Sequence, residues 1–184
     1  MGRIKTLITQ VSCLAMVLIM ASCGLSDEEI ETMNIEQNVD LQRYAGKWYE
    51  IARFPHSFEK NLVGVTATYT IRPDGKINVL NEGFKNTLDG KYKKATATAK
   101  VPDPGNPGRM KVFFFWPFGA DYLILELDKE NYQYALVGSS SDNFLWILSR
   151  NPQMDDSTYE MLVKKAEDRG YQVNRLEKVP QKKI

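Results

Sequence analysis

The feature that most restricts the fold of this chain is a series of short segments in which apolar and polar residues alternate. Residues 63–71 read VGVTATYTI and are followed by Pro73-Asp74-Gly75, in which Asp-Gly is a hairpin signal. Residues 92–101 read YKKATATAKV and end at Pro102. A period of two puts successive side chains on opposite faces of a β-strand, and turn residues end each strand. The pattern predicts an all-β fold.

Eight segments of this kind lie between residues 48 and 149. They are residues 48–54, 63–71, 76–84, 92–101, 109–116, 121–128, 132–138 and 144–149. Because the connections are short, consecutive strands should pair as an antiparallel meander. A closed meander has no free edge, and its interior holds side chains or one small ligand. We therefore expect an eight-stranded antiparallel up-and-down β-barrel.

One α-helix is predicted after the strands, near the C-terminus. Ser157 and Glu160 have the spacing of a capping box, Leu162 and Ala166 fall on one apolar face, and Gly170 supplies a left-handed stop. Such a helix should pack outside the barrel with its apolar face against the sheet. Residues 172–179 could add a short edge strand.

The alternation also predicts which side chains line the interior and contact a ligand. These candidate ligand-binding residues are Glu50, Ala52, Ala67, Tyr69, Val79, Asn81, Ala97, Ala99, Val112, Phe114, Trp116, Tyr122, Ile124, Phe144 and Trp146. Small residues such as Ala97 and Ala99 leave space, and space lined by aromatic side chains suits an apolar ligand. The alternative is that these alanines face a tightly packed helix outside the barrel.

Two of the candidate residues are polar. Glu50 shares the face of Trp48, so its carboxylate needs a partner or must take up a proton. Asn81 is a second polar side chain on an inward face. One interpretation is a polar anchor for the headgroup or carboxyl end of a ligand. The other is an internal hydrogen-bond cluster that includes buried water.

Residues 113–118 (FFFWPF) are the most apolar surface candidate. Trp116, Pro117 and Phe118 fall in the turn between two predicted strands. An exposed aromatic turn beside a membrane could help to pass lipid to the bilayer, whereas the alternative is that these side chains fold back over the interior. His56 is the only histidine and lies in a loop, where a solvated side chain is the ordinary role.

The first residues have the features of a secretion signal. Arg3 and Lys5 precede an apolar run over residues 11–20, and small residues precede Cys23. Since a bilayer-spanning helix needs about 20 residues, the run favours a cleaved signal over an uncleaved membrane anchor. We expect four parts: a signal peptide over residues 1–22, a lipidated N-terminus and acidic tether over residues 23–38, one domain over residues 39–180 and a tail over residues 181–184.

The residues before the expected cleavage site resemble the bacterial lipobox. Met20-Ala21-Ser22-Cys23 matches that motif, although Met20 stands where the motif mostly has Leu. The resemblance implies that Cys23 is lipidated, and Gly24, in place of the Asp that signals inner-membrane retention, implies anchoring in the outer membrane. Because Cys13 would leave with the signal, the mature chain would hold no free thiol for a disulfide, a nucleophile or a metal.

Composition and motifs argue against several classes of function. The 24 basic and 23 acidic side chains give a formal net charge of +1, which provides no electrostatic case for nucleic acid. The sequence contains no G-x-S-x-G motif, no Gly-rich phosphate loop and no His/Cys cluster. We therefore predict a protein that is not an enzyme and needs no metal and no cofactor.

Two longer motifs resemble those of the lipocalins. Residues 44–52 (YAGKWYEIA) resemble the first lipocalin motif, Y-x-G-x-W-Y-E-I-A, and residues 145–150 (LWILSR) are similar to the third, which ends in Arg. Residues 141–144 match the second motif only loosely. The resemblance covers residues 38–179 and implies a lipocalin barrel, closest to the bacterial outer-membrane lipoproteins and the apolipoprotein D group. It implies structural roles for Gly46, Trp48 and Arg150, with Arg150 stacked on the indole of Trp48 at the closed end.

This resemblance implies a binding protein that stores or transports a fatty acid or a lysophospholipid at the bacterial outer membrane, for envelope maintenance. One alternative is a carrier or scavenger of another hydrophobe such as haem, which Tyr69 or Tyr122 could ligate. Others are a ligand-free structural lipoprotein and a cryptic enzyme acting through Glu50. A homodimer would form if the exposed aromatic side chains paired.

Overall fold

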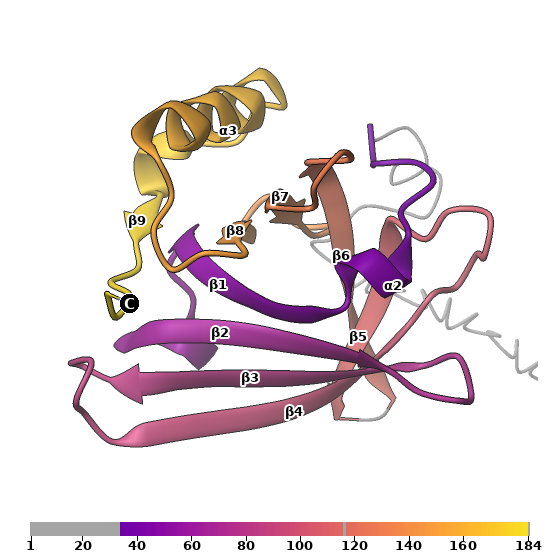
Figure 1. Ribbon diagram of the computed structural model, residues 1–184, viewed down its shortest axis with the longest axis horizontal. Coiled ribbons are helices and arrows are strands. Elements are labelled where there is room, and N and C mark those ends of the chain that lie inside the picture. The colour runs from indigo at the N-terminus through magenta and orange to yellow at the C-terminus, as the bar shows by residue number, and fades with distance from the viewer. Residues whose placement is uncertain (1–33, 116, 184) are drawn as a thin grey trace, which may run out of the picture.

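The computed structural model describes residues 34–115 and 117–183, whose strands form one closed antiparallel sheet (Figure 1). The strands are β1 (Gly46–Arg53), β2 (Leu62–Ile71), β3 (Ile77–Lys85), β4 (Tyr92–Lys100), β5 (Arg109–Phe115), β6 (Phe118–Leu127), β7 (Tyr134–Gly138), β8 (Leu145–Ser149) and β9 (Glu177–Lys178). Their order is β2-β3-β4-β5-β6-β7-β8-β1-β9, and β1 also pairs with β2. Since that pairing closes eight strands on themselves, the predicted barrel is confirmed. The short β9 is attached to the end of β1.

Most strand boundaries differ from the predicted ones by one or two residues, and the start of β6 differs by three. β6 begins at Phe118 and not at residue 121, because the pairing of β5 with β6 continues to Phe115 and Phe118 at the turn. Phe144 precedes β8 and belongs to the loop before it. Trp116 and Cys23 lie outside the described residues, so the roles predicted for them stay predictions.

The C-terminal helix α3 (Asp156–Asp168) forms as expected, but the predicted capping box is wrong. The N-cap residue is Asp155, whose carboxylate accepts a hydrogen bond from the backbone N–H of Thr158 at 2.8 Å and another from the hydroxyl of Ser157. Asp155 takes this role because its negative charge also interacts favourably with the helix N-terminus. At the other end, Gly170 adopts a φ of +85° and ends the helix as predicted.

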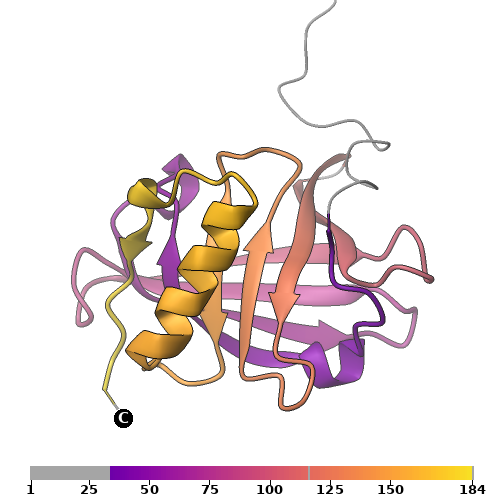
Figure 2. The ribbon, with the colours of Figure 1, turned by 90° about the horizontal axis from the view of Figure 1, so that it is seen from above.

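Helix α3 lies across the outer face of the barrel (Figure 2). The outer apolar cluster under it consists of Ile35, Ala52, Phe54, Leu123, Leu125, Leu136, Leu145, Ile147, Leu162, Ala166 and Tyr171. Leu162 is fully buried there, a contribution of about 1.5–3 kcal/mol for one leucine side chain. The molecule therefore has two apolar regions, one under α3 and one inside the barrel, and the predicted position of the helix is confirmed.

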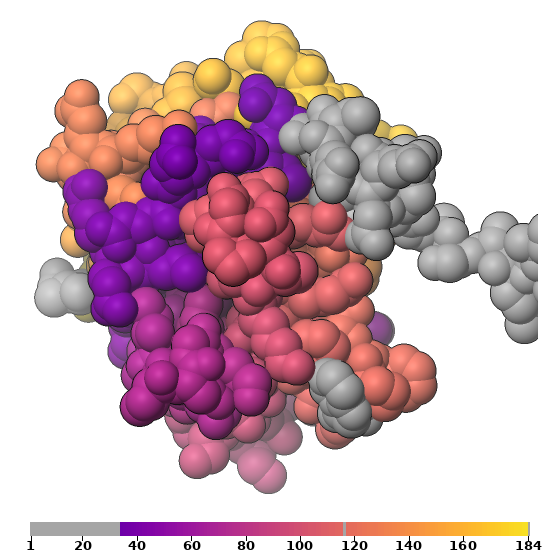
Figure 3. Space-filling model, turned by 90° about the vertical axis from the view of Figure 1, so that its right-hand side faces the viewer, coloured from indigo at the N-terminus to yellow at the C-terminus, as the bar shows by residue number. Residues whose placement is uncertain are grey.

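One end of the barrel is closed by the N-terminal segment. Helix α2 (Leu41–Tyr44) begins after Asp40, whose carboxylate accepts hydrogen bonds from two backbone N–H groups of the helix. The Tyr44 ring lies 5.0 Å from the Trp48 ring, and Trp48 Nε1 donates to the Tyr44 carbonyl oxygen at 2.8 Å. In Figure 3 this segment, in indigo, lies against the magenta and pink loops that follow β2 and β4. Helix α2 thus acts as a plug.

Arg150 fastens this plug to the barrel. Its guanidinium lies 3.9 Å from the centre of the Trp48 ring, which is the cation–π contact that the sequence predicts. The same guanidinium donates hydrogen bonds to the backbone carbonyl oxygens of Arg43, Tyr44, Ala45, Lys47 and Tyr132. Gly46 has a φ of +94°, and a Cβ there would lie 3.3 Å from Arg150 Nη1. The glycine of the G-x-W motif is therefore needed for both its conformation and the close approach of the arginine.

Candidate functional site

The inward side chains of the barrel become more exposed to solvent toward the end opposite the plug. Along β5 the inward side chains become steadily more exposed, from 0% at Met110 and 8% at Val112 to 40% at Phe114. Along β4, Ala97 is buried whereas Ala95, also on the inward register, is exposed. The β1–β2, β3–β4, β5–β6 and β7–β8 connections share this end, because connections alternate between the two ends of an antiparallel meander. We call it the mouth.

Most of the predicted lining residues lie together inside the barrel. The inner apolar cluster includes Ala67, Tyr69, Val79, Ala97, Ala99, Val112, Tyr122, Ile124 and Trp146. Asn81 pairs with Ala67 across β2–β3 and with Ala95 across β3–β4. These three side chains form a row that begins beside Trp48, which pairs with Ala67, and ends at the mouth with the exposed Ala95. The sequence analysis left Ala95 out of the list, although the same alternation that selected Ala97 places it on the inward face.

The prediction that Ala52 lines the interior is wrong. Ala52 is fully buried in the outer cluster beneath α3. The cause is an irregularity in the pairing of β1 with β8: Glu50 pairs with Leu148, but Ala52 pairs with Ile147 and Arg53 with Trp146. A β-bulge shifts the alternation by one residue, so it is Arg53 that follows Glu50 on the inward face.

Aromatic side chains gather at the mouth. The rings of Phe144 and Trp146 lie 5.9 Å apart and 13° from parallel, and Phe58 lies 6.1 Å from Phe144 and 6.3 Å from Phe114. His56 stacks on Phe58 with 3.8 Å between ring centroids. Phe114 and Phe144 are therefore residues of the mouth and not of the deep interior. The sequence analysis did not place Phe58 or predict the contacts of His56. Phe58 lies in a 3-10 turn and His56 directly precedes it, and the alternation of a β-strand does not predict where side chains in such a turn point.

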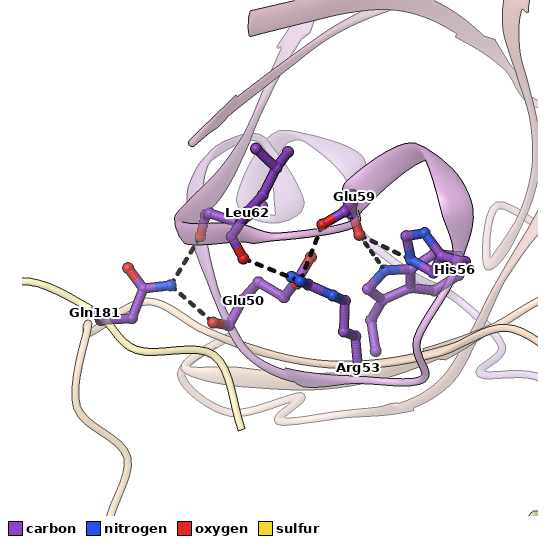
Figure 4. Close-up of polar contacts among 8 residues, drawn as sticks. Glu50, Arg53, His56, Glu59, Leu62 and Gln181 are labelled. Atoms are coloured by element: carbon purple, nitrogen blue, oxygen red, sulfur yellow. Dashed lines mark hydrogen bonds and ion pairs between the residues drawn. The ribbon is translucent and has the colours of Figure 1, made fainter. Parts of the chain in front are cut away.

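A buried polar network lies beside these rings (Figure 4). Glu50 and Arg53 of β1 form an ion pair, and Arg53 also donates to two backbone carbonyl oxygens at 3.0 and 3.1 Å. The Glu59 carboxylate accepts a hydrogen bond from Trp146 Nε1 at 3.4 Å. His56 Nε2 lies 2.8 Å from the same carboxylate, but the angles of this contact are not those of a hydrogen bond. The network joins β1, the loop after it and β8.

The Glu50–Arg53–Glu59 network carries one formal negative charge if both carboxylates ionise. Burial raises the pKa of Glu50 well above its usual value, and the neighbouring Glu59 carboxylate raises it further, while Arg53 opposes both effects. With Glu50 protonated, the charges of Arg53 and Glu59 cancel. Since Arg53 already donates to acceptors within the protein, this arrangement supports the interpretation of an internal hydrogen-bond cluster over that of an anchor for an anionic headgroup.

The Glu50→Gln variant tests this charge state. A carboxyl with a higher pKa in the folded than in the unfolded chain binds more protons when folded, so the wild type should lose stability as the pH rises above about 4.5. Glutamine keeps an acceptor for Arg53 and does not titrate. We expect the variant to gain at least about 1 kcal/mol over the wild type between pH 5 and pH 8 in urea unfolding, from the value of one pKa unit. Glu160→Gln, on the exposed face of α3, should follow the wild type. Parallel curves for Glu50→Gln and the wild type would show an ionised Glu50.

Three tyrosine hydroxyls meet in the interior toward the closed end. Tyr44 and Tyr122 are 2.6 Å apart, and Tyr69 donates to Tyr122 at 2.8 Å. Burial raises the pKa of all three phenols above the usual value. Because the hydroxyls of Tyr69 and Tyr122 bond to each other, the geometry does not favour them as haem ligands. Within residues 34–115 and 117–183, no group of three His, Cys, Asp or Glu side chains is placed to hold a metal ion.

An eight-stranded antiparallel barrel that is plugged at one end and open at the other is the architecture of barrels that hold one small ligand. The lipocalin-like domain family matches residues 39–181 of this chain. The chain is 40% identical over 146 residues to outer membrane lipoprotein Blc of Vibrio cholerae, which covers 79% of this chain and 85% of that protein. The chain belongs to the lipocalin family.

Further relatives come from eukaryotes. The chain is 42% identical over 162 residues to temperature-induced lipocalin-1 of Arabidopsis thaliana, covering 83% of this chain and 85% of that one. It is 36% identical over 137 residues to mouse apolipoprotein D, covering 70% and 69%. Among solved structures, lobster apocrustacyanin A1 matches with a TM-score of 0.65 at 21% identity over 88% of this chain and 89% of that one, which supports the fold.

Proposed function

We propose that the barrel holds the hydrocarbon chain of a single-chain amphiphile, a fatty acid or a lysophospholipid, with the polar end of the ligand at the mouth. The observation that carries this proposal is the row of small inward residues Ala67, Asn81 and Ala95, which runs from beside Trp48, the partner of Ala67 on β1, to the exposed Ala95 at the mouth. A barrel of eight strands has room for one small ligand. The Glu50–Arg53–Glu59 network supports a polar end outside the interior, because the guanidinium of Arg53 already donates to Glu50 and to two backbone carbonyl oxygens and so has few donors left for an anionic headgroup.

We further infer that the protein works at the bacterial outer membrane, anchored by a lipid on Cys23, and that it stores or delivers its ligand for envelope maintenance. The lipobox-like residues before Cys23 support the anchor. The names of relatives from Vibrio cholerae, Citrobacter freundii and Escherichia coli, each an outer membrane lipoprotein, support the location. A role in binding and not in catalysis agrees with the motifs of the sequence.

Native mass spectrometry of the chain from Gly24 onward tests the ligand. We expect a bound mass in the range of a fatty acid or a lysophospholipid in the protein as purified, and its loss after delipidation. A fluorescent fatty acid should then bind the delipidated protein at a ratio of one to one, as expected for one small ligand per barrel. Unlabelled fatty acid or lysophospholipid should displace it.

Three other outcomes would overturn this proposal. A protein that is empty as purified and binds no fluorescent fatty acid would be a ligand-free structural lipoprotein. A bound tetrapyrrole, visible in the absorption spectrum, would identify a carrier of haem or pigment. Turnover of the added lipid, detected as a change in its mass, would identify an enzyme.

A further inference from the structure

The β5–β6 hairpin leaves two large aromatic side chains in water. Phe115 is 80% exposed and Phe118 is 81% exposed, and the two residues pair across the turn. Phe114 precedes Phe115 in β5 and lies 6.3 Å from Phe58, and these two mouth residues are 40% and 56% exposed. Large aromatic side chains rarely form an exposed group on a soluble surface unless that surface contacts a partner. The partner of this surface must therefore offer an apolar environment to the rings of Phe115 and Phe118.

The same end of the barrel is rich in positive charge. Six exposed lysines lie on the β1–β2 loop, on the β3–β4 connection and the strand residues that flank it, and on the C-terminal segment: Lys60, Lys85, Lys91, Lys93, Lys94 and Lys182. We call them the lysine ring, although the β5–β6 and β7–β8 connections contain no lysine and the group lies on one side of the mouth. The acidic residues of these connections and of the β7–β8 loop are Glu82, Asp89 and Asp142, together with the buried Glu59 of the polar network. The six lysines outnumber these four acidic side chains, so the residues at the mouth include an excess of positive charge.

The lysine ring belongs to the mouth by contacts as well as by topology. Lys182 Nζ lies 3.6 Å from Asp89 Oδ1 and 4.6 Å from the centre of the Phe84 ring, which ties the C-terminal segment to the β3–β4 connection. Gln181 Nε2 donates to the carbonyl oxygens of Glu50 and Val65, at 2.8 and 2.9 Å (Figure 4). Residue 181, the first of the predicted tail, is thus held on β1 and β2, and it places Lys182 at the mouth.

We propose that the mouth docks on an anionic lipid bilayer, with Phe115 and Phe118 inserted among the headgroups and the lysine ring on anionic lipid. Phenylalanine side chains on an amphipathic surface bury at the boundary between headgroups and acyl chains, and lysines close to an anionic surface are attracted to it. A protein partner with an apolar patch would account for the rings alone, whereas an anionic membrane accounts for the rings and the lysines together. In this orientation a ligand passes between the barrel and the bilayer without crossing water.

Vesicle binding tests the proposal with the chain from Gly24 onward, which contains the whole barrel and lacks the acyl anchor. The probes are vesicles of phosphatidylcholine alone and vesicles with 30% phosphatidylglycerol, at low and high salt. We expect co-sedimentation with the anionic vesicles that weakens as salt increases. Phe115→Ser/Phe118→Ser should lower the partition coefficient at least ten-fold, and Lys93→Ser/Lys94→Ser should lower it and reduce its dependence on salt. Lys47→Ser, an exposed lysine at the closed end, is the matched control and should bind like the wild type.

Two results would contradict membrane docking. A wild type that does not sediment with anionic vesicles, or aromatic and lysine variants that bind as it does, would overturn it. A wild-type dimer in sedimentation velocity that Phe115→Ser/Phe118→Ser converts to a monomer, without vesicle binding, would make the patch a homodimer interface. All variants should keep the melting temperature of the wild type and its one-to-one binding of fluorescent fatty acid. If the wild type did not bind the fluorescent fatty acid, the proposed ligand function would be wrong, whereas the vesicle result would still test membrane docking. The two proposals can therefore fail separately.

Discussion

Arg150→Met should lower the free energy of unfolding by about 1.5–3 kcal/mol, the range for a hydrogen bond that involves a charged group. The guanidinium donates to five backbone carbonyl oxygens and lies 3.9 Å from the Trp48 ring. Methionine retains much of the apolar contact with Trp48 but supplies no donor. The carbonyl oxygens around the plug would then have to turn toward water, which would loosen α2 from the barrel.

Urea unfolding followed by tryptophan fluorescence measures this loss. Arg175→Met is the matched control, because Arg175 also lies over an aromatic ring, that of Phe54 at 4.6 Å, but makes a more exposed hydrogen bond to Asn143. We expect it to cost about 1 kcal/mol or less, as for exposed cation–π pairs. Arg150→Lys should show most of the loss in unfolding free energy that we expect for Arg150→Met, since a lysine cannot donate to several carbonyl oxygens at once. Equal losses for Arg150→Met and Arg175→Met would show that the hydrogen bonds around the plug add little.

Ala95→Phe should weaken binding of a fluorescent fatty acid at least ten-fold, which is about 1.4 kcal/mol. Ala95 is exposed at the mouth and lies on the inward register of β4, opposite Asn81. A phenyl ring there would occupy the space through which the hydrocarbon chain enters. Because the position is exposed, the added ring does not overpack the core, and the melting temperature should stay within a few degrees of the wild type.

Thr96→Phe is the matched control for this variant. Thr96 is the next residue of β4, is also exposed, and faces the outside of the barrel. The same ring added at this position should leave the affinity unchanged. Equal affinities for Ala95→Phe and the wild type would exclude the mouth as the entrance. Equal losses in both variants would point to a general effect on the sheet instead of a blocked entrance.

The mouth residues show where sequence reasoning stopped. Period-two alternation placed Tyr69, Val79 and Ala97 in the interior, because β2, β3 and β4 pair regularly in the part of the sheet where these residues lie. The same rule failed at Ala52, because a bulge in β1 turns Ala52 to the outer face of the barrel and Arg53 to the inner face. A bulge depends on how two strands fit together, and nothing in the composition of β1 predicts it.

The sequence by itself determined the number of barrel strands, the closed meander and the helix outside it, since local periodicity and turn residues specify strands and short connections specify their neighbours. The Trp48–Arg150 pair followed from the resemblance of two sequence motifs to those of the lipocalins. Only the tertiary structure decided that Arg53 and Glu59 are the neighbours of Glu50 and that aromatic rings and lysines share one end of the barrel. These features depend on contacts between residues far apart in the chain. Trp146 and Glu59, which bond to each other, are 87 positions apart. Periodicity is a property of neighbouring residues and carries no information about such contacts.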